Sequence, residues 1–64
     1  MTEEEVYQKA RQVVGLGGMT VNERLYASGL VDTFDKAKKE DKPLAEKILL
    51  ALKVDRPSIN KILK

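Results

Sequence analysis

The sequence contains no cysteine, no histidine and no tryptophan among its 64 residues. Without cysteine the chain forms no disulfide bond, and without cysteine or histidine it lacks the usual ligands of structural zinc. Acid–base and nucleophilic catalysis at neutral pH also draw mainly on these two residue types. We therefore expect a protein that is not an enzyme, with no catalytic residue, no metal site and no cofactor.

Long apolar runs are also missing. None approaches the roughly 18 residues that a membrane-spanning helix needs, and Glu3, Glu4 and Glu5 stand where a secretory signal peptide carries positive charge. We expect a cytoplasmic protein with no membrane partner. A chain this small can hardly enclose the ~300 Å³ pocket that a small-molecule substrate occupies.

The residues that are present favour a folded chain. Hydrophobic residues make up 42% and charged residues 34% of the sequence, a balance typical of a folded domain. The length allows one domain, which we place at residues 1–64. So short a chain buries only about 60% of the surface that its unfolded form exposes. Association with a partner or with a second copy would therefore stabilise it.

Charge is unevenly distributed around a net value of +2. Residues 1–35 carry three basic and six acidic side chains, whereas residues 36–64 carry nine basic and four acidic ones. Such asymmetry either steers a polyanion to one face or reflects the frequent use of lysine on exposed helices. We favour the second interpretation.

Two capping boxes divide the first half of the chain. Thr2 and Glu5 have the Thr-x-x-Glu spacing that opens a helix, and the apolar stripe behind them predicts a helix over about 3–14. Glycines then predict a loop at 15–19. This loop lacks the Lys-Ser/Thr pair and the preceding strand of a nucleotide-binding loop, so we interpret it as a linker.

The second capping box, formed by Thr20 and Glu23, predicts a long helix over about 20–39. Gly29 lies inside this helix, where glycine costs about 1 kcal/mol relative to alanine. It therefore marks either a kink or a point where another helix comes close. We favour close approach, with a notch at Gly29 that admits a neighbouring side chain.

The C-terminal part predicts two further helices. Pro43 fits the first turn of a helix over about 42–53, whose broad apolar face predicts the centre of the core. Asp55 is placed to cap a short helix over about 56–63. The fold class that follows is all-α, a small orthogonal bundle of four short helices.

A helix-turn-helix that reads DNA is one functional hypothesis for the segment 43–64. Its apolar residues recur where that motif packs its two helices, and its polar residues recur where the motif meets DNA. Lys53 and Arg56 would hold phosphates, and the last helix would expose the other candidates. The candidate DNA-binding residues are Lys53, Arg56, Ser58, Asn60, Lys61 and Lys64.

Three features argue against DNA reading. Lys53 occupies the turn position where such motifs usually have glycine, and Leu49 stands where a small alanine usually lets the helices cross. The last helix is also short, at barely two turns. We therefore keep DNA binding as the alternative function and nucleic acid as the less favoured partner.

The leading hypothesis is a non-catalytic protein–protein interaction module, binding another protein or a second copy of itself. Tyr26 adjoins Leu25 but is offset from the main apolar stripe, so we expect it to be half exposed. Together with the notch at Gly29 and the neighbouring Leu30, it forms the candidate interaction site. The hypothesis depends on the small core and on the wide apolar face of the segment 42–53.

Several of these residues also belong to a wider pattern. A Val-Asn-Glu-Arg-Leu opening, a Ser-Gly-Leu step, a Phe-Asp pair and a final Ile-Leu-containing helix resemble a group of very short bacterial proteins. The resemblance covers about residues 19–63, and the group has no established activity. It implies a recurring set held by helix capping and by an internal Glu-Arg or Ser-backbone contact. That set is Asn22, Glu23, Arg24 and Ser28.

Overall fold

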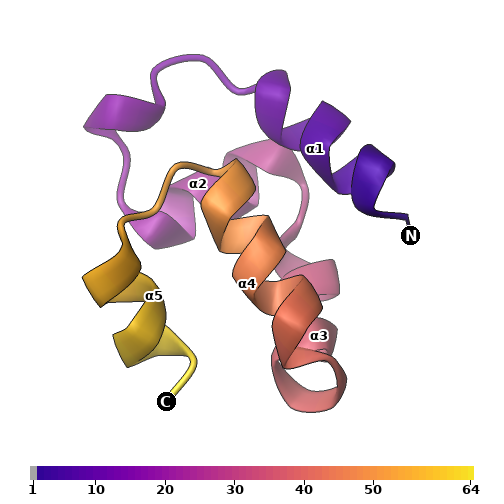
Figure 1. Cartoon of the computed structure of the whole chain (residues 1–64). Coiled ribbons are helices and arrows are strands. Elements are labelled where there is room, and N and C mark those ends of the chain that lie inside the picture. The colour runs from indigo at the N-terminus through magenta and orange to yellow at the C-terminus, as the bar shows by residue number, and fades with distance from the viewer. Residues whose placement is uncertain (1) are drawn as a thin grey trace.

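The computed structural model describes residues 2–64, which form five α-helices and one short 3₁₀ helix, with no strand in this range. The all-α class is therefore confirmed. Helix α4 runs through the middle of the molecule, with α1 and α5 on opposite sides of it (Figure 1). In chain order the elements are α1 (Glu3–Arg11), η1 (Leu16–Gly18), α2 (Val21–Ser28), α3 (Val31–Glu40), α4 (Lys42–Ala51) and α5 (Arg56–Ile62).

The predicted single helix over 20–39 is wrong, because Gly29 ends α2 and α3 starts two residues later. Gly29 has φ +73°, in the left-handed region. Its N–H donates to the carbonyl of Tyr26 at 3.1 Å, and the N–H of Leu30 donates to the carbonyl of Leu25 at 3.0 Å. This pair of bonds is a Schellman motif, which closes a helix and favours glycine at its left-handed position. The described chain therefore has five α-helices rather than four.

The preference for close approach at Gly29 is also wrong. A Cβ atom built at this glycine would meet only the Nζ atom of Lys9, at 4.0 Å. No neighbouring helix enters a notch there. Gly29 is needed for its backbone angle, since a left-handed φ costs most residues about 1 kcal/mol or more.

The remaining helix bounds differ from prediction at their C-terminal ends. Helix α1 stops at Arg11 rather than at residue 14, and the predicted loop at 15–19 contains the 3₁₀ turn η1. Helix α4 stops at Ala51 because Lys53, with φ +61°, makes a second left-handed turn. Helix α5 ends one residue early, at Ile62, a difference within the ordinary variation of helix ends.

The predicted helix starts are confirmed at atomic detail. The Thr20 hydroxyl accepts the Glu23 N–H at 3.2 Å, and the Glu23 carboxylate accepts the Thr20 N–H at 3.0 Å. The same reciprocal bonds join Thr2 and Glu5 at the start of α1. Each box satisfies two backbone donors that the first turn of a helix leaves without partners.

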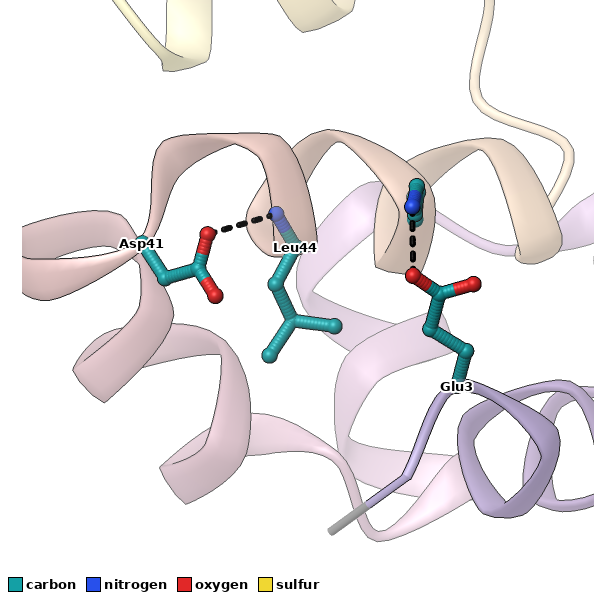
Figure 2. A network of polar contacts seen from close by, with 4 residues as sticks. Glu3, Asp41 and Leu44 are labelled. Carbon is teal, nitrogen blue, oxygen red and sulfur yellow. Dashed lines mark hydrogen bonds and ion pairs between the residues drawn. The ribbon is translucent and has the colours of Figure 1, made fainter.

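Aspartates cap α4 and α5. The Asp41 carboxylate accepts the Leu44 N–H at 3.3 Å, as Figure 2 shows. The Asp55 carboxylate accepts the Ser58 N–H at 3.2 Å. Both helices also carry proline in their first turn, where a missing N–H leaves no hydrogen bond unmade.

Helix α4 is the centre of the core, as its apolar pattern predicts. It packs against both α3 and α1, and truncating a fully buried leucine or isoleucine to alanine in such a core costs about 2–5 kcal/mol. The largest fully buried side chains are Val6, Leu30, Ile48, Leu49, Leu52 and Ile59.

An ion pair joins α1 to α4. The Glu3 carboxylate contacts the Nζ atom of Lys47, and Figure 2 shows Glu3 directed at α4 from the first turn of α1. This contact raises the pKa of Lys47, chiefly through the hydrogen bond with Glu3. Both side chains are about half exposed, so burial of Val6 and Ala10 contributes more to the docking of α1.

Candidate interaction groove

A groove of about 740 Å³ opens between α2, α3 and α5. None of these helices forms it alone, because each contributes one wall. Thr20, just before α2, completes the rim. The groove is lined by Thr20, Val21, Asn22, Leu25, Tyr26, Val31, Phe34, Asp35, Lys38, Ser58, Lys61 and Ile62.

The floor of the groove is apolar. Leu25 and Phe34 are each 5% exposed and belong to the core, and Val21, Val31 and Ile62 pack against that core while remaining partly exposed. The groove is therefore an opening onto the core. A ligand that covered these side chains would remove apolar surface from water, which is the main favourable term in protein association.

The rim of the groove carries both signs of charge. Asp35 and Lys38 stand on the α3 wall, and Lys61 stands on the α5 wall. All three side chains are exposed. A charged rim around an apolar floor is the arrangement found at many protein interfaces.

Tyr26 stands beside the groove and is 82% exposed, a high value for an aromatic residue in the middle of a helix. A second depression of about 420 Å³ lies on its other side. Because Tyr26 lines both depressions, it lies between them as a protruding ring. The second depression is lined by Met19, Asn22, Glu23, Tyr26 and Ala27.

Arg24 ties the α2 wall to the turn before α5. Its Nε donates to the carbonyl of Met19 at 3.1 Å, and its Nη1 donates to the carbonyls of Leu52 and Lys53 at 3.2 and 3.0 Å. The last two acceptors lie in the turn between α4 and α5, where helix geometry leaves carbonyls without partners. Arg24 therefore sets how α2 and α5 sit relative to one another.

The sequence did not reveal this role for Arg24. The resemblance implied an internal Glu-Arg or Ser-backbone contact, and only the second is present: the Ser28 hydroxyl donates to the carbonyl of Leu25 at 3.0 Å. A usable signal was the predicted helix end at Lys53. Carbonyls at such an end attract a cationic side chain.

The three residues predicted as an interaction site separate in the structure. Tyr26 and Gly29 are exposed, but Leu30 is completely buried and packs in the core. The Leu30 side chain is therefore inaccessible to a partner in the folded chain. Of the three, only Tyr26 lines the groove.

The candidate DNA-binding residues lie on α5 and its flanking turns. Asn60, Lys61 and Lys64 are exposed, whereas Ser58 is half-buried and lines the groove. Arg56 is exposed, but its Nη1 contacts the Glu46 carboxylate at 2.8 Å.

Lys53 adopts the left-handed conformation that glycine usually supplies in the turn of a helix-turn-helix. The N–H of Val54 donates to the carbonyl of Leu49 at 3.0 Å, and that of Lys53 donates to Leu50 at 2.9 Å. This is the same Schellman closure as at Gly29. The turn geometry that the lysine was expected to oppose is therefore present.

Two carboxylates next to the groove have lowered pKa values. Hydrogen bonds from the Ser58 hydroxyl and N–H lower the pKa of Asp55, and a hydrogen bond from the Thr20 backbone lowers the pKa of Glu23. Both carboxylates cap helices, and an ionised carboxylate caps a helix more strongly than a protonated one. Their shifts are explained by capping and call for no catalytic role.

Over residues 2–64, no three acidic side chains come together to hold a metal ion. In the same range every buried polar side-chain atom has a hydrogen-bond partner. No helix in the described part of the chain has the length and apolar character needed to cross a membrane. Comparison with models of protein families, with curated proteins and with solved structures finds no match to this chain.

Proposed function

We propose that this chain is a non-catalytic interaction module of the cytoplasm that binds a protein surface in the groove between α2, α3 and α5. The observation that carries the proposal is Tyr26, 82% exposed at the edge of an apolar groove. Tyrosine is enriched at protein interfaces because it offers a large apolar face together with a hydroxyl.

The walls of the groove support this proposal. Two of the three walls belong to helices with side-chain caps at their starts, α2 and α5, and the groove is already formed in the free chain, so little ordering is needed on binding. Arg24 holds α2 against the turn that leads into α5. Preformed sites of this kind bind partners whose shape matches them.

Affinity capture from native cells tests the proposal, with and without nuclease treatment. The wild-type chain should retain a protein that survives nuclease, and Tyr26→Ala should lose it. Asn22→Arg, which places a long side chain between the two depressions, should have the same effect. Val14→Ala is the matched control, because Val14 is a large apolar residue 87% exposed outside the groove.

The proposal is rejected if Tyr26→Ala and Val14→Ala retain the same proteins in the same amounts. Circular dichroism of each variant shows whether it is folded. Tyr26 makes little contact with the core, so we expect all three variants to keep the wild-type helical spectrum.

A second candidate function is DNA binding by α4 and α5. It is favoured by the left-handed turn at Lys53 and by the exposed cations Lys61 and Lys64. It is weakened by the ion pair of Arg56 with Glu46 and by the length of α5, seven residues. We therefore rank it second.

Titration with duplex DNA at low salt separates the two functions. DNA binding predicts chemical-shift changes at Asn60, Lys61 and Lys64 and an affinity that falls steeply with salt. The double variant Lys61→Glu, Lys64→Glu should abolish these changes, and Lys36→Glu, Lys39→Glu on α3 serves as the matched charge control. Unchanged spectra in wild-type protein would eliminate this candidate.

A further inference from the structure

The surface around Tyr26 contains a protrusion and a hollow side by side. The Tyr26 ring is 82% exposed, and the groove beside it holds about 740 Å³. An interface with two-fold symmetry uses the same patch on both copies, so a patch with a protrusion must also contain a hollow that receives it. A patch built for an unrelated helical ligand needs only the hollow.

We infer that the groove is occupied by a second copy of this chain, with the Tyr26 ring of each copy entering the groove of the other. This inference rests on the proposed function, because it names the partner of the same groove. The Tyr26 ring of one copy then packs on the apolar floor at Leu25 and Phe34 of the other, and both surfaces are removed from water.

Charges on the rim agree with self-association. Asp35 lies on the α3 wall and Lys61 on the α5 wall, and these two helices stand on either side of α4 in the view of Figure 1. A two-fold axis along the groove brings the α3 wall of one copy over the α5 wall of the other. In the register that sets Asp35, rather than Lys38, opposite the partner's Lys61, the two walls attract one another, and this pair occurs twice. A rim designed for an acidic or a basic foreign partner would carry one sign alone.

The size of the patch predicts a reversible dimer. The two depressions beside Tyr26 are lined by fifteen residues in all, because the sets of twelve and five share Asn22 and Tyr26. Stable interfaces use about 20–30 residues a side. We therefore expect monomer and dimer to exchange in the micromolar concentration range. The dimer fraction should depend strongly on concentration.

Sedimentation equilibrium of the full chain over a wide concentration range is the test. The wild-type chain should show a monomer–dimer equilibrium, Tyr26→Ala should weaken it by about tenfold or more, and Val14→Ala should leave it unchanged. Asp35→Lys alone and Lys61→Glu alone should each weaken the dimer, since each places like charges opposite one another twice.

The most specific test mixes the Asp35→Lys variant with the Lys61→Glu variant. In the mixed dimer, the lysine introduced at position 35 of one copy faces the glutamate introduced at position 61 of the other. At the second contact the native Lys61 faces the native Asp35. Association should therefore return to near the wild-type strength. A wild-type dimer that neither Tyr26→Ala nor the charge changes affect would overturn the inference, and so would a mixture that fails to associate.

A monomer at every concentration also overturns the inference. In that case the capture experiment still distinguishes the two proposals. If the chain retains a different protein and Tyr26→Ala loses it, the proposed function holds and the groove has another occupant. If the chain neither dimerises nor retains such a protein, both the dimer and the proposed function are rejected. Circular dichroism of each variant ensures that a loss of association is not a loss of folding.

Discussion

The guanidinium of Arg24 donates a hydrogen bond to the backbone carbonyl of Lys53, at 3.0 Å, across 29 positions of sequence. The same nitrogen also reaches the carbonyl of Leu52 at 3.2 Å. Lys53 is the one non-glycine residue with a positive φ among residues 2–64. Arg24 on α2 therefore fixes the turn that sets the direction of α5. Because α5 forms one wall of the groove, Arg24 also fixes the position of that wall.

Replacing Arg24 tests this relationship. Arg24→Ala should lower the free energy of unfolding by about 1–3 kcal/mol, since it removes charge-assisted hydrogen bonds to backbone carbonyls. Arg11→Ala, a change to an exposed arginine on α1, should cost well under 1 kcal/mol. Urea unfolding measures both. Hydrogen exchange should also accelerate selectively in residues 53–64 of Arg24→Ala. Uniform acceleration would mean that Arg24 stabilises the fold without positioning α5.

The two left-handed turns should respond in opposite directions. Gly29→Ala should destabilise the chain by about 1–2 kcal/mol, because φ +73° disfavours a Cβ atom even where space is open. Lys53→Gly should stabilise it by roughly 0.5–1 kcal/mol, because it relieves the same strain at φ +61°. Thermal unfolding followed by circular dichroism measures the change. Gly17→Ala, which has neither crowding nor a positive φ, is the control.

Acidification should destabilise the fold through two caps. The pKa values of Glu23 and Asp55 are lowered in the folded chain, so their stabilisation is complete above their ordinary values and is lost as the pH falls through the lowered ones. The resistance of the chain to urea should therefore fall as the pH drops below about 4.5. Glu23→Gln and Asp55→Asn together should flatten this dependence. An unchanged pH profile in the double variant would assign the effect to other carboxylates.

The core prediction compares two leucines that are adjacent on α4. Leu49→Ala should cost about 2–5 kcal/mol, because Leu49 is completely buried at the centre of the core. Leu50→Ala should cost far less, since Leu50 is 45% exposed. Urea unfolding of both variants gives the difference. Equal losses would mean that α4 presents a different face to the core.

Local signals in the sequence predicted four of the five α-helix starts within residues 2–64, and the start of α3, which no side chain caps, was missed. Thr20 and Glu23 lie three positions apart, as do Asp55 and Ser58, and such caps form within one turn whatever the rest of the chain does. The wide apolar face of α4 was also predicted correctly, since helical periodicity alone decides which residues share a face.

Helix ends were harder to predict. Gly29 was compatible with a kink or with close packing, and only the left-handed φ showed that it ends α2. The long helix over 20–39 was favoured because apolar residues kept their spacing past the glycine. Leu30, which follows the glycine, is completely buried, so the break between α2 and α3 lies against the core.

The sequence by itself determined the all-α class, the caps and the apolar face of α4, because these depend on residues within one or two helical turns of one another. Tertiary structure alone decided the groove, the exposure of Tyr26 and the contacts of Arg24. The groove joins walls from α2, α3 and α5, and Arg24 meets acceptors 28 and 29 positions away. Such contacts form only when packing of the whole core sets the directions of the helices, which no local pattern encodes.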